Sequence, residues 1–281
     1  MIISVASGKG GTGKTTVAVA LALSLSEENP VQFLDCDVEE PDAHLFLQPE
    51  IKRSFPVEVP IPEILEDRCI NCGLCSQFCA YKALAVLKDK VLIFPELCHS
   101  CGGCQLICPE QAVKEVGQWV GVAEYGSAGK IQFIQGKLDI GQARPTPLIS
   151  EIKKQIIPNN LVLIDSPPGT SCPVVEAVRD SHFTLLVTEP TPLGLNDLKL
   201  SVEVLRQLEI PMGVIINRAG LGADNLIEDY CRQENIPVLM KIPFDREIAR
   251  AYSQGKPLTV ALPQYREKFK KLLSAIKELA R

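Results

Sequence analysis

The sequence predicts an α/β fold, in which a mostly parallel sheet carries helices on both faces and a small α+β domain is inserted. Short apolar stretches alternate with stretches of helical periodicity along most of the 281 residues, which is typical of strand–helix units in a parallel sheet. Eight of the eleven cysteines lie within residues 63–117, where the composition changes sharply. We therefore expect a discontinuous main domain, residues 1–62 and 118–281, and an inserted domain, residues 63–117.

Composition and charge limit the class of protein. Apolar residues make up 46% of the chain, enough for a packed core, and the net charge of −5 argues against general affinity for nucleic acid. No apolar run approaches the ~20 residues that a membrane span needs, and the chain does not open with a signal-peptide pattern. We expect a cytoplasmic protein with no stable membrane span and no nucleic-acid partner, whose cysteines bind metal rather than form disulfides.

The first strand–helix unit contains a phosphate-binding loop. An apolar strand over residues 1–6 leads into residues 8–15, GKGGTGKT, and then into a helix over residues 16–23. The loop meets the pattern G-x-x-x-x-G-K-[ST], in which backbone N–H groups surround a phosphate at a helix N-terminus. We expect Lys14 to reach the terminal phosphates and Thr15 to bind Mg²⁺. The residues expected to bind ATP or ADP here are Gly8, Gly10, Gly11, Thr12, Gly13, Lys14, Thr15 and Thr16.

The second predicted strand, residues 31–34, ends at two aspartates. Because ligands bind at the carboxyl ends of strands in open α/β sheets, we expect Asp35 and Asp37 to order the attacking water and to provide a second metal contact. Residues 43–62 contain four prolines and mixed charge, which predicts a connector without regular structure.

The remaining strands follow the cysteine-rich stretch. The β-rich pieces at residues 119–122 and 130–134 predict a hairpin or two edge strands. Residues 161–164 form a continuous apolar run, typical of a strand buried on both faces, and end at Asp165, which we expect to hold the water shell of the metal. Further strand–helix units are predicted, with strands at residues 183–187, 212–216 and 237–240 and helices near residues 195–208, 224–234 and 263–280.

The cysteines of the inserted stretch form two similar blocks, each with the spacing C-x₂-C-x₂-C-x₃-C. This is the spacing of bacterial two-cluster ferredoxins, in which the fourth cysteine of each block ligates the other cluster. Zinc is the alternative, but three cysteines at strict three-residue intervals do not suit a single tetrahedral ion. We therefore expect two [4Fe–4S] clusters, one on Cys69, Cys72, Cys75 and Cys108, the other on Cys98, Cys101, Cys104 and Cys79.

Three motifs of the main domain resemble those of the MinD/ParA superfamily of ATPases, which includes the nitrogenase iron protein and Mrp-type iron–sulfur cluster carriers. The phosphate loop with its second lysine, Lys9, resembles the deviant Walker A motif of that superfamily. Residues 35–37, DCD, are similar to its switch I, and residues 165–170, DSPPGT, to its switch II.

The resemblance implies a homodimer that sandwiches two nucleotides, with Lys9 reaching the nucleotide of the partner chain. Such a lysine adds positive charge where phosphoryl transfer develops negative charge. The resemblance also implies that Asn217 reads adenine and that Pro243 packs near the base. The residues predicted to be catalytic are Lys9, Lys14, Asp35, Asp37 and Asp165.

The three cysteines outside the blocks have separate interpretations. We expect Cys36 and Cys231 to be small buried apolar residues. Cys172 resembles in position a cluster ligand of the nitrogenase iron protein, so two interpretations stay open, a structural residue or the ligand of a shared or transient cluster.

Taken together, the sequence resembles a MinD-superfamily ATPase with an inserted two-cluster ferredoxin domain. Our first hypothesis is an ATPase whose nucleotide state controls electron transfer through the clusters to an unknown protein partner. The alternative is a carrier that delivers clusters to an acceptor protein. A third hypothesis, a positioning ATPase like the cell-division relatives, is disfavoured because the C-terminal helix is more typical of a packed surface helix than of a membrane anchor.

Overall fold

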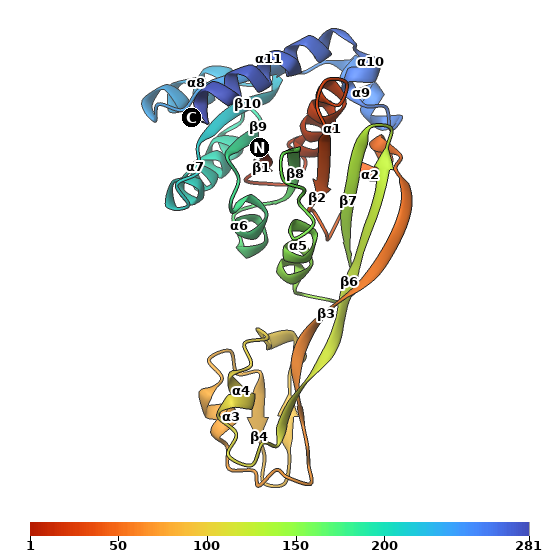
Figure 1. Ribbon diagram of the computed structural model, residues 1–281. Coiled ribbons are helices and arrows are strands. Elements are labelled where there is room, and N and C mark those ends of the chain that lie inside the picture. Colours follow the sequence, from red (N-terminus) through yellow and green to blue (C-terminus); the bar gives the residue numbers. More distant parts are fainter. Residues whose placement is uncertain (281) are drawn as a thin grey trace.

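A nine-stranded sheet forms the centre of the protein in the computed structural model, which describes residues 1–280 (Figure 1). In chain order the strands are β1 (Ile2–Ser7), β2 (Val31–Asp35), β3 (Glu50–Ile64), β6 (Val113–Ala128), β7 (Ile131–Leu138), β8 (Leu161–Pro168), β9 (Phe183–Thr188), β10 (Met212–Ala219) and β11 (Val238–Pro243). Their order in space is β11-β10-β9-β1-β8-β2-β7-β6-β3. The pairs from β11 to β7 are parallel, whereas β6 pairs antiparallel with β7, and β3 with β6. The predicted mostly parallel sheet is confirmed.

Helices cover both faces of this sheet, as predicted. One face carries α1 (Lys14–Leu25), α2 (Ala43–Leu47), α10 (Leu258–Ala261) and α11 (Gln264–Leu279). The other carries α5 (Pro145–Lys153), α6 (Cys172–Val178), α7 (Pro192–Gln207) and α8 (Asp224–Gln233). Since successive side chains of a strand point to opposite faces, Phe33 packs with the first group and Leu34 with the second. The predicted helices near residues 195–208, 224–234 and 263–280 correspond to α7, α8 and α11.

The prediction of a connector without regular structure over residues 43–62 is wrong. This stretch contains α2 and most of β3, the last strand in the order of the sheet. Proline lacks a backbone N–H and is tolerated in sheets mainly at an edge, where that missing donor need not serve a neighbouring strand. Pro56, Pro60 and Pro62 are therefore compatible with an edge strand. Several prolines in a short stretch are also typical of a loop, which explains the wrong prediction.

The predicted hairpin at residues 119–122 and 130–134 is confirmed by β6 and β7. Ala128 pairs with Ile131 across a two-residue turn, in which Gly129 has φ 58°. A positive φ in such a turn matches the twist of the flanking strands and favours glycine.

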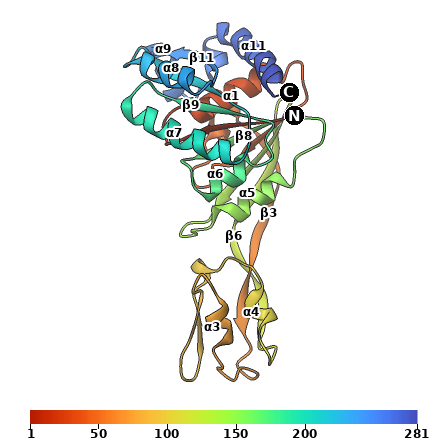
Figure 2. The ribbon, with the colours of Figure 1, turned by 90° about the vertical axis from the view of Figure 1, so that its left-hand side faces the viewer.

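A small cysteine lobe, residues 65–112, lies at the far ends of β3 and β6 (Figures 1 and 2). It contains α3 (Leu74–Phe78), β4 (Leu84–Val86), β5 (Val91–Ile93), η1 (Pro95–Leu97) and α4 (Gly103–Leu106). The two long strands stay paired from Glu50 and Ser127 in the main sheet to Ile64 and Val113 beside the lobe. The predicted boundaries at residues 63 and 117 lie within these strands, so a continuous two-stranded ribbon joins the lobe to the sheet.

The cysteine lobe has an internal repeat with an offset of 29 residues, the distance from Cys69 to Cys98 in the sequence. Gly73 and Gly102 occupy equivalent positions and have φ 82° and 69°, each at the N-terminus of a short helix, α3 and α4. The pairing of Leu84 with Ile93 in β4 and β5 has its counterpart in the pairing of Val113 with Ile64. The two cysteine blocks thus belong to two copies of one small unit.

None of the helices formed by residues 1–280 has the length and apolar character required to cross a membrane.

Candidate functional site

The phosphate-binding loop, residues 8–15, connects β1 to α1. Gly11 and Gly13 have φ 76° and 91°, values that residues with a side chain rarely adopt, and Gly13 is the N-cap of α1. A Cβ atom at Gly8 would lie 2.3 Å from the carbonyl oxygen of Asp197 in α7. Gly8 therefore allows close packing against α7, whereas Gly11 and Gly13 give the loop its left-handed turns.

A cavity of about 470 Å³ opens in front of this loop, within the usual range for small-molecule sites. All the predicted nucleotide-binding residues except Gly8 line it, and Asp37 lines it as well. Sequence reasoning missed Arg218 and Tyr252, which lie at the end of β10 and in α9 (Arg246–Ser253). The predicted residues that line the cavity are Gly10, Gly11, Thr12, Gly13, Lys14, Thr15, Thr16, Asp37, Asn217 and Pro243.

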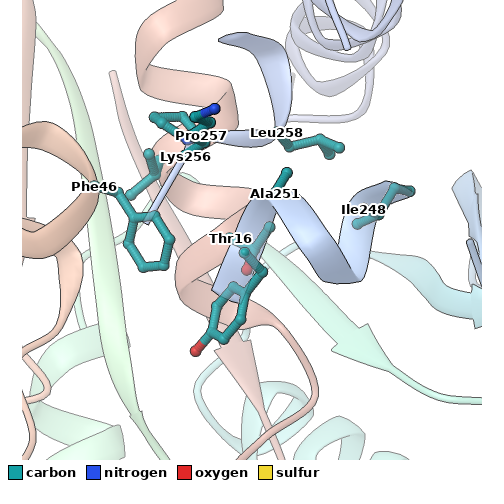
Figure 3. Close-up of a pocket in the computed structure, with 9 residues that line it drawn as sticks. Thr16, Phe46, Ile248, Ala251, Lys256, Pro257 and Leu258 are labelled. Atoms are coloured by element: carbon teal, nitrogen blue, oxygen red, sulfur yellow. The ribbon is translucent and has the colours of Figure 1, made fainter. Parts of the chain in front are cut away.

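A smaller apolar hollow adjoins the cavity beside α1. Figure 3 shows Thr16 of α1, Phe46 of α2 and Ile248 of α9 around it. The rings of Phe46 and Tyr252 pack with their centroids 5.3 Å apart. This contact links α2, which follows Asp37 in the chain, to α9, which lines the far side of the cavity.

Three acidic groups surround the buried ammonium of Lys14. Its Nζ atom lies 2.9 Å from Asp37 Oδ2 and 3.5 Å from Asp165 Oδ1. Burial alone would lower the pKa of Lys14, but the carboxylates of Asp165, Asp37 and Asp35 hold it above its ordinary value. Lys14 is therefore charged at neutral pH. It lines the cavity and contacts the aspartates at the ends of β2 and β8.

Asp165 is fully buried and, like Asp35, is not among the residues that line the cavity. Its carboxylate faces the ammonium of Lys14 and the hydroxyl of Thr15. Burial raises the pKa of Asp165 to about 6, against the opposing effect of Lys14. A buried carboxylate with so few polar partners is costly to keep ionised. Together with Thr15, which lines the cavity, it offers the hard oxygen atoms that Mg²⁺ and its bound water require, so these residues fit the predicted metal.

Asp35 has a different environment from Asp37. Its two carboxylate oxygens accept hydrogen bonds from the backbone N–H groups of Asp37, at 3.2 Å, and Ala43, at 3.1 Å. The side chain is fully buried and does not line the cavity; burial and the nearby Asp165 raise its pKa well above the ordinary value. The structure therefore brings Asp37 to the predicted nucleotide site and places Asp35 beneath it, where it holds the backbone between β2 and α2.

Lys9, the second residue of the phosphate loop, forms an ion pair within its own chain. Its ammonium contacts the carboxylate of Glu189, which directly follows β9. Glu189 also accepts a hydrogen bond from Arg218 Nη1 at 2.9 Å, and Arg218 Nη2 donates to the carbonyl of Gly11 at 3.0 Å. Burial alone would raise the pKa of Glu189, but the hydrogen bond and charge of Lys9, with those of Arg218, lower it. This carboxylate thus holds two cations at the edge of the loop.

Asn217 fixes the phosphate loop from the end of β10. Its Nδ2 atom donates to the carbonyl of Thr12 at 2.7 Å, and its Oδ1 atom accepts from the backbone N–H of Arg218 at 2.9 Å. A Cβ atom at Gly13 would lie 2.3 Å from the same Nδ2 atom. Since Asn217 also lines the cavity, its predicted contact with adenine stays a prediction, and loop support is a second role that the sequence did not indicate.

The eight block cysteines line two separate small cavities in the cysteine lobe. One is lined by Cys69, Cys72, Cys75 and Cys108, and the other by Cys79, Cys98, Cys101 and Cys104. These are the two predicted sets, each with one cysteine from the other block. Within residues 1–280, no three histidine, cysteine, aspartate or glutamate side chains converge as the ligands of a single metal ion do.

Backbone N–H groups point at the sulfur atoms of the crossing cysteines. The amide of Ala83 donates to Cys79 Sγ at 3.3 Å, and the amide of Ala112 donates to Cys108 Sγ at 3.2 Å. These two bonds are equivalent in the 29-residue repeat of the lobe. Hydrogen bonds of this kind stabilise thiolates and tune iron–sulfur clusters, so the donor set fits the predicted cofactors.

All eleven cysteines are free thiols. Cys36 and Cys231 are buried among apolar side chains, as predicted, and burial raises the pKa of Cys231 to about 11. Cys172, by contrast, is exposed at the first position of α6, so it is not a packing residue of this chain.

The fold and the cavity at the phosphate loop define a nucleotide-binding protein of the α/β class. Its family is shown by comparison, because a sequence model of the CobQ/CobB/MinD/ParA nucleotide binding domain matches residues 3–258. The chain belongs to this family, which confirms the resemblance to MinD/ParA proteins. The match says nothing of the two-cluster character of the cysteine lobe, which stays a prediction.

The relatives of the chain span nearly its full length. Two uncharacterised proteins of Methanocaldococcus jannaschii are 29% and 31% identical to it, over 91% and 99% of this chain and 90% and 97% of their own. An iron–sulfur cluster carrier protein of Pyrococcus horikoshii is 22% identical over 99% of this chain and 87% of its own. Among solved structures, the septum site-determining protein MinD of Pyrococcus horikoshii, complexed with Mg-ADP, is similar in fold, with a TM-score of 0.60 at 22% identity, covering 99% of this chain and 96% of its own.

Proposed function

We propose that this protein binds and hydrolyses ATP and couples its nucleotide state to electron transfer through two [4Fe–4S] clusters. The observation that carries the proposal is the β3–β6 ribbon. It leads, with two shifts of register, from the sheet that bears the phosphate loop to the lobe that bears the two cysteine sets. A lobe held by paired strands moves with the sheet edge that carries it, unlike one tethered by a flexible linker.

The proposed nucleotide site uses residues that already line or flank the cavity. Lys14 reaches the terminal phosphates and Thr15 binds Mg²⁺, which supplies compensation of the phosphate charge when it is bound. Asp165 holds the water shell of the metal, and Asp37 orders the attacking water. Lys14 Nζ lies 2.9 Å from Asp37 Oδ2, so phosphate binding at Lys14 competes with that ion pair and releases Asp37 for its role.

Lys9 completes the proposed site of a second chain in a homodimer. Its side chain is 31% exposed and is engaged with Glu189, so assembly requires that this ion pair opens. Arg218 stays beside Glu189 and compensates its charge when Lys9 leaves. Because Glu189 keeps Arg218 as its partner, the release of Lys9 is less costly than it would be if it left an unpaired carboxylate.

The proposed clusters occupy the two cavities of the cysteine lobe. Four thiolates line each cavity, and the clusters supply one-electron chemistry when bound. The partner that gives or takes the electron is a protein that contacts the lobe. Exposed Cys72 and Cys101, one in each set, place an edge of each cavity near the surface.

EPR spectroscopy of the dithionite-reduced protein, with and without Mg-ATP, tests the coupling. We expect two cluster signals, at least one of which changes on addition of ATP in wild type and does not change in Lys9→Ala. The control is Lys130→Ala, a cation removed from the exposed turn between β6 and β7. Signals that ignore the nucleotide in wild type, or a Lys9→Ala variant that responds like wild type, would refute the coupling.

A cluster carrier is the second candidate function, and one observation favours it. Cys172 is exposed at the start of α6, where a labile cluster would be accessible, and relatives of the chain include proteins named as iron–sulfur cluster carriers. Transfer of a cluster to an apo acceptor, with the spectrum of the lobe unchanged and with loss of transfer in Cys172→Ala, supports the carrier. Reversible reduction without transfer supports electron transfer.

A further inference from the structure

Arg144 joins the main body of the protein to the cysteine lobe. It is the N-cap residue of α5, and its Nη1 atom donates to the main-chain carbonyl of Cys98 at 3.1 Å. Its Nη2 atom donates to the side-chain oxygen of Gln118 in β6. Of the side-chain hydrogen bonds within residues 1–280, the bond to Cys98 is the one that links residues 65–112 to the rest of the chain.

The guanidinium of Arg144 has little compensation from the protein. No carboxylate of residues 1–280 lies within ion-pair distance of it, and its Nε atom is buried without a hydrogen-bond partner. Its two hydrogen-bond partners are a carbonyl oxygen and an amide oxygen, both neutral. Because a half-buried cation without a counter-charge is poorly compensated, a negative group near Cys98 would complete this arrangement.

The cavity that Cys98 lines is the place for such a group. It is bordered by four thiols, those of Cys79, Cys98, Cys101 and Cys104. A cluster ligated by four thiolates is anionic and becomes more so on reduction, so a nearby cation stabilises the reduced form and raises the reduction potential. Neither cavity is lined by an arginine, and each is lined by one carboxylate, Glu115 here and Glu110 in the other. The two sets differ in that Arg144 bonds to the main chain of Cys98, whereas no lysine or arginine side chain of residues 1–280 bonds to a cysteine of the other set.

The helix that Arg144 caps, α5, is anchored to the neighbouring helix α6. At the other end of α5, Lys153 Nζ donates to the carbonyls of Glu176 and Arg179, at 2.5 Å and 2.7 Å, at the end of α6. The helix α5 is thus tied to α6, whose first residue lies shortly after Asp165 in the chain. The guanidinium projects from an anchored helix rather than from a free loop.

We propose that Arg144 is a positioning residue that fixes the Cys98 segment against the main body and raises the reduction potential of the cluster in that set above what it would be without the cation. This inference rests on the proposed two-cluster function. It assigns different potentials to the two clusters, although their ligand spacings are the same.

Redox titration followed by EPR tests the charge of Arg144. Wild type, Arg144→Gln and Arg144→Lys are compared, with Lys154→Gln as the control because Lys154 is an exposed cation of the same helix region. We expect Arg144→Gln to move the potential of one cluster to more negative values and to leave the other unchanged. Arg144→Lys, which keeps the charge, retains most of the wild-type potential. Unchanged potentials in Arg144→Gln, an equal shift of both clusters, or a shift in Arg144→Lys as large as in Arg144→Gln would overturn the charge role.

A second measurement reads the contact itself without clusters. Trp119, the single tryptophan of the chain, follows Gln118 and is 41% exposed, so its fluorescence reports on the ribbon beside Arg144. We expect acrylamide to quench Trp119 more strongly in the iron-free Arg144→Gln and Arg144→Lys proteins than in wild type. Equal quenching would overturn the positioning role. Iron and sulfide analysis of the same samples separates the two proposals, because a wild-type chain that holds no clusters refutes the proposed function itself.

Discussion

Replacement of Asp165 by asparagine is expected to stabilise the nucleotide-free protein, although Asp165 belongs to the proposed active site. The carboxylate is fully buried, and the polar groups that face it are the ammonium of Lys14, 3.5 Å away, and the hydroxyl of Thr15. Burial raises the pKa of Asp165 from 3.8 to about 6. The ionised form is therefore less favourable in the folded chain than in the unfolded chain.

The size of the effect follows from this shift in pKa. A difference of about 2 pKa units corresponds to roughly 3 kcal/mol, at about 1.4 kcal/mol per unit. The folded chain binds the proton more tightly than the unfolded chain. The contribution of Asp165 to stability is thus greatest below pH 3.8, falls as the pH rises through about 6, and is lowest above it. Asparagine carries no charge, so the variant does not lose stability as the pH rises through about 6.

Thermal unfolding of the nucleotide-free, iron-free protein between pH 4.5 and pH 8 checks the prediction. At pH 8 we expect the Tm of Asp165→Asn to exceed that of wild type by roughly 6 °C, at about 2 °C per kcal/mol for a chain of this size. The difference shrinks toward pH 4.5, and Asp89→Asn, a change at an exposed aspartate of the lobe, leaves Tm unchanged. A variant less stable than wild type at pH 8, or a difference independent of pH, would refute the reasoning.

Three further changes test other parts of the site. Gly13→Ala places a Cβ atom 2.3 Å from Asn217 Nδ2 at φ 91°; we expect a loss of at least 1–2 kcal/mol of stability and weaker ATP binding by calorimetry, and unchanged values would contradict the close approach. Glu189→Gln weakens the ion pair of Lys9 by about 1 kcal/mol. We expect sedimentation to show a roughly fivefold larger association constant for the ATP-dependent dimer, whereas less dimer would show that Glu189 serves the dimer directly. Cys79→Ser removes the crossing ligand from the cavity of Cys98, Cys101 and Cys104; we expect EPR to show loss or conversion of one cluster with the other intact, and perturbation of the other cluster alone would reverse the assignment.

The features that could be predicted from sequence are those encoded by neighbouring residues. The glycines and Lys14 of the phosphate loop form one contiguous motif, and the loop, the strand before it and α1 lie where that motif requires. The cysteine blocks are similarly local, and their repeat reappears as similar, left-handed backbone angles at Gly73 and Gly102. In each case the conformation depends on residue types within a few positions.

The features that sequence reasoning missed depend on residues far apart in the chain. Lys9 and Glu189 are separated by 180 positions, and Asn217 reaches Thr12 across 205, so no local pattern indicates either contact. Asp35 and Asp37 look equivalent in sequence, yet only Asp37 lines the cavity, since the strand end and α2 place the Ala43 amide on Asp35. The prolines of β3 suggested a loop because their tolerance in a strand depends on an edge position, and the order of strands in the sheet is not visible in the local sequence.

The same kind of long-range contact gives the proposed coupling a physical route. Val38 directly follows Asp37 at the cavity, and its carbonyl accepts a hydrogen bond from the amide of Leu138, the last residue of β7, at 2.8 Å. Residues 139–143 then lead to Arg144 and its bond to Cys98. A second route, through α6 and Lys153, enters α5 from its other end. Because both routes meet at α5, displacement of Asp37 or of the segment after Asp165 by nucleotide would act on the lobe through Arg144. Loss of Arg144 should therefore weaken the response of the clusters to ATP more than loss of Lys153 alone, which EPR of the two reduced variants, with and without Mg-ATP, would measure.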